Sequence, residues 1–371
     1  MTRKAPVFYH RNIIVGSDAH SLECFALLNK STEDVYILSE APLSATSIAL
    51  DGPNQLRGEQ NLKGLVSIYP ELEFSLSEQK ICFYKDLKFK EFGGRAKSEP
   101  LLKGEDFFTS PSICAPMAEL FPGMNNSEVK EKAFSRQINK RLTKIEIVSP
   151  SNFAEPVNFI LYCGDNTELH AENLIWCRTP YELTDLLEDS KKISPELLEY
   201  CHQTRAYSAL YLTFPLKKEI QLPCETFFIP LSFTHEWGHF IGELLPASSA
   251  PHFGKLQFVM YLDTNESSEE VISRNIKILK RHLEKIFKNI KEIFGDEVIS
   301  LSSDISGQKI VSKPLERESL LGKNLFFING SAPFAHLSEE KKSFDDSVFS
   351  STHLSRALIS RNYLAQNLEN I

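Results

Sequence analysis

The chain has 371 residues, of which 42% are hydrophobic, and a formal net charge of −8. This length allows one large hydrophobic core or two medium ones. The negative charge argues against a nucleic-acid partner, and no apolar run approaches membrane-spanning length. The seven cysteines are scattered and form no CxxC pair, which is typical of buried thiols in a reducing compartment. We therefore expect a soluble, cytoplasmic protein.

The first pattern along the chain runs from Asn12 to Glu40. An apolar run at 13–15 meets Gly16, an amphipathic stretch follows, and a second apolar run leads to Glu40. Strand, tight turn, helix, strand and acid is the order of a dinucleotide-binding βαβ unit. This segment predicts an α/β fold.

The rest of the chain predicts a mixture of strands and helices. A helix of about 269–294 is amphipathic, and a second helix is expected near 351–368. Between and around them lie strand-like runs at 89–92, 144–148, 157–162, 174–177, 207–214, 226–233, 255–262 and 324–330.

Three of these segments, in this order, resemble the flavin-dependent amine oxidase and phytoene desaturase superfamily. The first is Ile13-Ile14-Val15-Gly16 through to Glu40. The second is 157–177, in which Ala171-Glu172-Asn173-Leu174-Ile175 is similar to the "ADxVI" strand of that superfamily. The third is 322–330 with the closing helix, similar to the late strand whose end touches FAD.

The resemblance implies an FAD/NAD(P)-binding Rossmann-like domain and a mixed-sheet α+β substrate-type domain. The nucleotide-binding-type domain would comprise 1–65, 113–188 and 300–371, and the substrate-type domain 66–112 and 189–299. The implied function is that of an FAD-dependent oxidoreductase, a flavoprotein acting on a small or hydrophobic substrate. No spacing of Ser, His, Asp or Cys assigns a catalytic residue. The cofactor-binding residues would be Gly16, Ser17, Asp18, Ser21, Glu40, Gly330 and Ser331.

The chain departs from this superfamily at three places. The glycine-rich turn G-x-G-x-x-G is here Gly16, Asp18 and Ser21. We expect the Asp18 carboxylate to project toward the FAD pyrophosphate, where like charges repel. The Gly-Gly-Arg that follows the acid is replaced by residues 43–45, and Ser331 stands where an acid is usual. FAD is therefore expected to bind weakly or not at all, and a flavin-free binding or interaction module for a protein partner is the alternative.

A second alternative is a zinc metallopeptidase, because His235-Glu236-x-x-His239 matches HExxH. On one helix face the two histidines would bind Zn²⁺, and Glu236 would be the general base. Against this, the preceding residues 226–233 suggest a strand, and Leu245 stands where a third ligand would fall. Glu269 or Glu270 remains a distant third ligand. We prefer a strand and turn here, and therefore expect no metal site.

Overall fold

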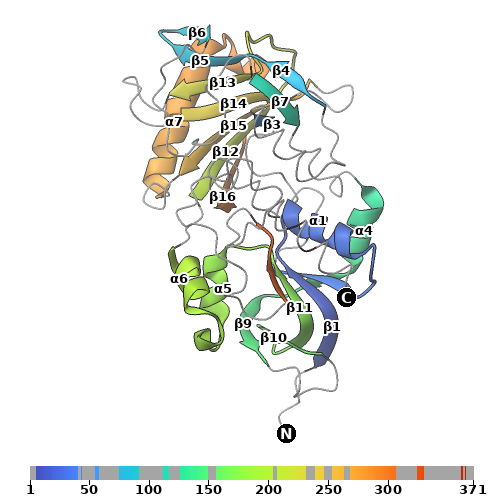
Figure 1. Cartoon of the computed structure of the whole chain (residues 1–371). Helices are drawn as coiled ribbons and strands as arrows, with labels where there is room; N and C mark the ends of the chain where they lie inside the picture. Colours follow the sequence, from blue (N-terminus) through green and yellow to red (C-terminus); the bar gives the residue numbers. More distant parts are fainter. Residues whose placement is uncertain are drawn as a thin grey trace, which may run out of the picture. The chain divides into compact units, whose positions relative to one another are not determined.

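The computed structural model describes residues 6–40, 43, 55–57, 75–91, 112–116, 126–148, 156–203, 207–230, 239–245, 253–262, 268–305, 324–329, 361 and 364. The chain forms two compact units, each built from segments far apart in the sequence. Unit 1 comprises Met1–Leu50, Ala118–Arg205 and Ile310–Ile371, and unit 2 comprises Asp51–Met117 and Ala206–Lys309. Figure 1 shows the elements of both units in chain order by colour.

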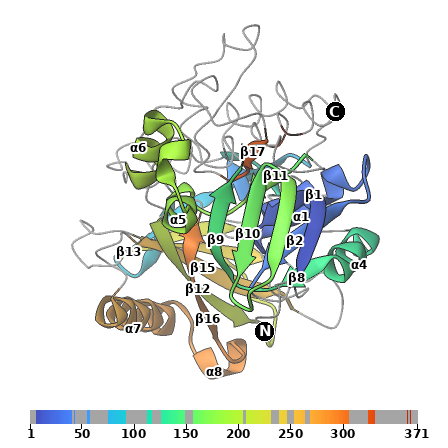
Figure 2. The ribbon, with the colours of Figure 1, turned by 90° about the horizontal axis from the view of Figure 1, so that it is seen from below.

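Unit 1 is built on a seven-stranded sheet with the order β8-β2-β1-β11-β10-β9, in which β17 also pairs with β11 (Figure 2). The strands β8, β2, β1, β11 and β17 are parallel, whereas β10 and β9 are antiparallel to their neighbours. Their bounds are β1 Val7–Val15, β2 Val35–Ser39, β8 Gln137–Asn139, β9 Leu142–Ile147, β10 Phe159–Cys163, β11 Glu168–Trp176 and β17 Leu325–Phe327.

The parallel part of this sheet confirms the predicted βαβ unit. Helix α1 (Ala19–Leu28) connects β1 to β2, and Val15 lies opposite both Leu38 and Trp176. The late strand, β17, lies in the same sheet, as the resemblance implied. Parallel strands of one sheet end at a common edge, and in such folds that edge is where ligands bind.

One face of this sheet packs against the short helices that follow β11. These are α5 (Pro180–Leu186), the 3₁₀ helix η4 (Ser190–Lys192) and α6 (Pro195–Gln203). Leu183, Ile193 and Leu197 from this region join the sheet's buried core. The segment 189–203 therefore belongs to unit 1, and the prediction that placed it in the substrate-type domain was wrong. Helix α4 (Ser127–Ser135) precedes β8.

Unit 2 contains a seven-stranded sheet with the order β16-β12-β15-β14-β13-β5-β6. Only the β13–β5 pair is parallel. The bounds are β5 Ile81–Lys85, β6 Lys88–Glu91, β12 Tyr207–Pro215, β13 Thr226–Pro230, β14 His239–Leu245, β15 Lys255–Leu262 and β16 Val298–Ile305. A small separate sheet has the order β3-β7-β4, formed by Gln55–Arg57, Ser112–Pro116 and Ser77–Gln79.

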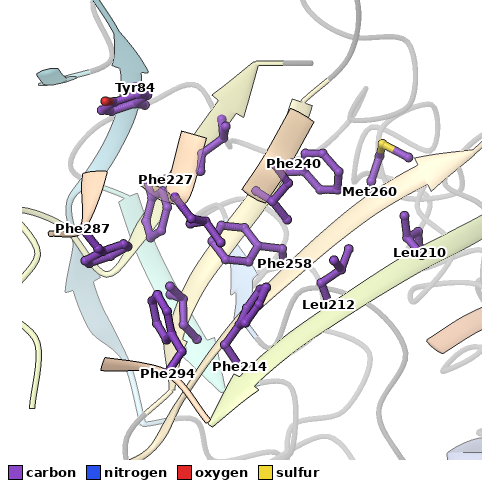
Figure 3. Close-up of a cluster of buried hydrophobic side chains, with 14 of the residues drawn as sticks. Tyr84, Leu210, Leu212, Phe214, Phe227, Phe240, Phe258, Met260, Phe287 and Phe294 are labelled. Carbon is purple, nitrogen blue, oxygen red and sulfur yellow. The ribbon is translucent and has the colours of Figure 1, made fainter. Parts of the chain in front are cut away.

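Helix α7 (Glu269–Ile286) covers one face of the larger sheet in unit 2. Its Leu279 and Leu283 are wholly buried with Phe227 and Phe258 of the strands. Figure 3 shows the aromatic residues of this core, in which the rings of Phe227 and Phe258 lie edge to face with their centroids 5.7 Å apart. The amphipathic pattern that predicted this helix is thus explained by its buried stripe.

Two further predictions differ from the structure. The long helix expected to reach 294 ends at Ile286, because Phe287 takes an extended conformation, and a short helix α8 (Ile290–Ile293) follows. The predicted domain boundary at 300 cuts through β16, which pairs with β12 inside unit 2. Among the described residues, no helix combines the length and the apolar character needed to cross a membrane.

Candidate dinucleotide-binding site

The turn after β1 requires glycine at position 16. Gly16 has a φ of +150°, a backbone conformation that residues with a side chain rarely adopt. A Cβ atom here would lie 2.4 Å from the Oγ atom of Ser21 and 3.0 Å from the Cβ atom of Cys177. The backbone N–H of Gly16 donates to the carbonyl of Leu38 at 3.2 Å. The first glycine of the predicted motif therefore has its expected structural role.

Ser21 takes the place of the third glycine and packs tightly against the turn. Its side chain is wholly buried in the first turn of α1, directly against Gly16. The third glycine of the motif permits close packing of helix on strand. A small serine retains that packing only because position 16 has no Cβ atom. Ser17, between the two, is partly buried.

Asp18, which replaces the second glycine, is the N-cap of α1. Its Oδ1 atom accepts hydrogen bonds from the Ser21 backbone N–H at 2.9 Å and from the Ser21 hydroxyl at 2.7 Å. The carboxylate thus turns back onto its own helix. The prediction that it projects outward, toward a pyrophosphate, was wrong. The pattern Asp-x-x-Ser before a helical run is an N-cap signal, and could have predicted this from the sequence.

Glu40 follows directly after β2 and is exposed. Because Val15 lies opposite Leu38 in the parallel β1–β2 pair, Gly16 and Glu40 are at the same edge of the sheet. This confirms the predicted arrangement of glycine and acid at adjoining strand ends. An acid at this place binds the ribose of a dinucleotide in Rossmann-type units.

Ionisable side chains gather around the first turns of α1. Burial lowers the pKa of His20, an effect that the Asp18 carboxylate opposes and the Arg361 guanidinium strengthens. His20 is therefore neutral at pH 7. Glu23 is buried in α1, and its Oε2 atom lies 3.7 Å from the Nη1 atom of Arg361. Sequence reasoning missed this pair, because 338 positions of the chain separate the two residues and no local pattern links them.

Cys177 lies at the same edge, one residue after β11. Its backbone N–H donates to the carbonyl of Val15 at 3.0 Å. Burial, followed by the neighbouring Cys24 thiol, raises the pKa of Cys177 well above its usual range. A thiol that resists ionisation is a poor nucleophile, so this cysteine packs rather than reacts. As predicted, the following cysteines are free, buried thiols: Cys24, Cys82, Cys163, Cys177, Cys201 and Cys224.

The late strand brings an unsatisfied polar atom to this edge. The backbone N–H of Ile328 donates to the carbonyl of Trp176 at 2.9 Å, which aligns the end of β17 with the end of β11. The buried Asn329 donates its amide N–H to the carbonyl of Arg178. Within the part of the chain that the structure describes, its Oδ1 atom accepts no hydrogen bond. A buried acceptor of this kind fits a ligand that offers a hydroxyl or N–H group. Gly330 and Ser331, implied by the resemblance, lie outside the described residues.

The HExxH alternative does not meet its structural requirement at His239. This residue begins β14 and pairs with Pro230 of β13 in an antiparallel ladder. Zinc binding by HExxH needs both histidines on one helix face, so the helical interpretation is wrong at His239. His235 and Glu236 lie outside the described residues. No group of three or more metal-ligating side chains occurs among the residues whose placement is described.

Comparisons with known proteins agree with this architecture at the level of the fold. A geranylgeranyl bacteriochlorophyll reductase-like protein from Thermoplasma acidophilum is 11% identical over 98% of this chain and 79% of its own, with a TM-score of 0.54. A putrescine oxidase bound to putrescine is 8% identical, covering 99% and 100% of the two chains, with a TM-score of 0.55. An oxidoreductase from Methanosarcina mazei is 10% identical, covering 96% and 100%, with a TM-score of 0.56.

Identities this low establish the fold and not the activity. The chain shares its overall fold with these proteins, and the parallel sheet that begins with β1, α1 and β2 confirms the predicted Rossmann-like α/β fold. No protein-family model and no curated protein sequence matches the chain.

Proposed function

We propose that this protein is an FAD-dependent oxidoreductase of the amine oxidase and desaturase type, acting on a small or hydrophobic substrate. The observation that carries the proposal is the edge of the unit 1 sheet. There Gly16 makes the tight turn into α1, and Glu40 directly follows the neighbouring strand. The likeness to oxidoreductases extends over nearly the whole chain, which supports the same conclusion.

The residues at this edge fit FAD with one exception. Gly16 and Ser21 form the close turn, Glu40 is placed to accept hydrogen bonds from ribose hydroxyls, and the Oδ1 atom of Asn329 offers a buried acceptor. Ser17, Gly330 and Ser331 complete the proposed set. The exception is Asp18, whose carboxylate lies at the N-terminus of α1.

When bound, FAD would supply the acceptor for two electrons from the substrate. The chain's own residues would bind and orient it. The turn at Gly16 permits a close approach of the backbone, and the neutral His20 adds no charge beside it.

A binding test with Glu40→Ala examines this assignment. We expect the wild-type protein to bind FAD with a dissociation constant of about 10 μM or weaker, and the variant at least tenfold more weakly, because it loses the ribose contact. Quenching of flavin fluorescence measures both. Glu33→Ala is a matched control, since Glu33 is an exposed acid just before the first residue of β2, at the end of the strand opposite to Glu40. Equal affinities for wild-type and Glu40→Ala proteins would contradict the assignment.

The position of Asp18 favours a second candidate function, a flavin-free relative that serves as a binding or interaction module. A carboxylate already satisfies the end of α1 that would face a pyrophosphate. A wild-type protein that binds no FAD at concentrations near 1 mM, roughly the weakest affinity worth measuring, would support this candidate.

A further inference from the structure

We propose that Asp18 acts as an internal substitute for the cofactor phosphate: its carboxylate occupies the N-terminus of α1, and FAD binds only when that side chain is displaced. This inference rests on the proposed function, because it concerns how the same edge of unit 1 receives FAD. It adds that FAD binds weakly because the Asp18 carboxylate already occupies the helix end, and not because of charge repulsion alone.

The first argument is the contact itself. The N-terminus of an α-helix presents unpaired backbone N–H groups and the positive end of the helix dipole, and these favour an anion. Asp18 meets part of this demand, because its Oδ1 atom accepts one backbone N–H of the helix end, that of Ser21, together with the Ser21 hydroxyl. Hydrogen bonds to an ionised acceptor are stronger than those between neutral groups. A pyrophosphate would need to replace these bonds before it gained its own.

The second argument is that the turn has no room to yield. A Cβ atom built on Gly16 would lie only 2.4 Å from the Oγ atom of Ser21 and 3.0 Å from the Cβ atom of Cys177. The strand end and the helix are therefore in close contact on both sides of the turn. Ser21 is wholly buried and Ala19, at the start of α1, is also buried. The helix therefore cannot retreat from an incoming phosphate. The Asp18 side chain is the group that can rotate away.

The third argument is the local charge. His20, next to Asp18, is neutral at pH 7 because burial lowers its pKa. The guanidinium of Arg361 lies against the buried carboxylate of Glu23 at 3.7 Å, so its charge is already matched. Arg361 is therefore shared between Glu23 and any other anion at this helix end, and it offsets Asp18 and a pyrophosphate together only in part. Occupancy and charge therefore oppose FAD in the same place.

Three variants separate occupancy from charge. Asp18→Asn keeps a good N-cap acceptor but removes the charge, Asp18→Gly removes both, and Asp18→Glu keeps the charge on a side chain that caps poorly. We expect Asp18→Gly to bind FAD at least tenfold more tightly than the wild type, with Asp18→Asn between them. Asp18→Glu should bind more tightly than the wild type if occupancy matters, and no more tightly if only charge does.

A matched control tests whether the loss of any helix N-cap changes the FAD affinity. Asn126 caps α4 with hydrogen bonds from the N–H groups of Glu128 and Val129. Asn126→Gly should leave the FAD affinity unchanged. Without FAD, Asp18→Gly should lower the melting temperature by only about 1 °C, because glycine is itself tolerated at an N-cap, and Asp18→Asn should keep the cap and the wild-type value.

The outcomes distinguish the two proposals. Equal FAD affinity in wild-type, Asp18→Asn and Asp18→Gly proteins would overturn the inference about Asp18 and leave the proposed function intact. An Asp18→Glu affinity at or below that of the wild type would also overturn it, since charge alone would then explain the weak binding. Absence of FAD binding in every variant, with folding verified by circular dichroism, would contradict both proposals.

Discussion

Gly16 is the residue on which the geometry of the candidate site depends most. Alanine at this position would combine an unfavourable φ of +150° with a contact of 2.4 Å to the Ser21 Oγ atom. We expect Gly16→Ala to lower the free energy of unfolding by roughly 1–3 kcal/mol, as for overpacked or strained positions. Urea unfolding measures the change.

Gly164 provides a control for the same chemical substitution. A Cβ atom at Gly164, in the turn after β10, would meet its nearest neighbour at 3.7 Å, which is an ordinary van der Waals contact. Gly164→Ala should therefore have little effect. Equal losses in the two variants would show that Gly16 has no special role in the turn.

The pair formed by the buried Glu23 and the largely buried Arg361 supports a second prediction at this scale. Removing one partner of a buried ion pair leaves the other charge uncompensated in a poorly solvated place. Arg361→Met should destabilise the protein by about 3 kcal/mol, and the added change Glu23→Gln should recover part of that loss. Thermal unfolding of the single and double variants measures both. A double variant no more stable than Arg361→Met would count against the pair.

At the residue scale, the sequence predicted the positions of the site better than the directions of its side chains. Gly16 and Glu40 lie where the βαβ pattern placed them. The direction of the Asp18 side chain was predicted from repulsion between its charge and a ligand. In the structure, its carboxylate instead accepts a hydrogen bond from the first turn of its own helix. The unpaired N–H groups of the helix end determine the side-chain direction, because they need an acceptor whether or not a ligand is bound. Asn329 was missed because its surroundings come from another segment: its amide N–H donates to the carbonyl of Arg178, whereas its Oδ1 atom accepts no hydrogen bond from the described residues.

Among the elements, the central strands of unit 1 share a chain of amide side chains. Asn173 of β11 donates to Asn12 of β1 at 3.0 Å, and Asn324, just before β17, donates to Asn173 at 2.8 Å. Asn12 in turn donates to the carbonyl of Asp34 at 3.3 Å. Asn12 and Asn173 are opposite each other in the β1–β11 register, and both are buried. These bonds are satisfied only when the three strands are in this register.

This chain of amides leads to a third prediction. Asn173→Ala leaves the Asn12 Oδ1 atom and the Asn324 amide without this partner in a buried place, which should cost about 1–3 kcal/mol. Adding Asn12→Ala should cost less than its effect alone, because the shared bond is already lost. A double-mutant cycle by urea unfolding measures the coupling. Strict additivity would show that the amides do not act together.

The elements that the sequence could not predict are those decided by long-range packing. The apolar period of α7 continues beyond Ile286, but Phe287 leaves the helix and packs its ring against Phe294, with centroids 5.2 Å apart. Here a tertiary partner overrides the local pattern. The HExxH pattern also suits a helix, but the preceding residues 226–233 had already favoured a strand and turn, and His239 indeed pairs with Pro230 of a neighbouring strand.

For the whole molecule, the order of segments along the chain predicted the discontinuous sheet of unit 1. Strand β17 joins β11 although 148 residues lie between the two strands. The unit boundaries were less accurate, since Leu197 of α6 belongs to the core of unit 1 and β16 belongs to unit 2. A boundary depends on which core a segment packs against, and composition does not reveal that.

The central claim is that unit 1 holds a redox-active FAD at the edge marked by Gly16 and Glu40. The most direct test dialyses the wild-type protein, at about 100 μM, to equilibrium against FAD at about 100 μM, so that weak binding is retained, and compares the visible spectra on the two sides of the membrane. We predict an excess of flavin on the protein side, below one per chain, which bleaches when a chemical reductant is added under anaerobic conditions and regains its colour in air. Equal flavin concentrations on the two sides of the membrane would contradict the claim.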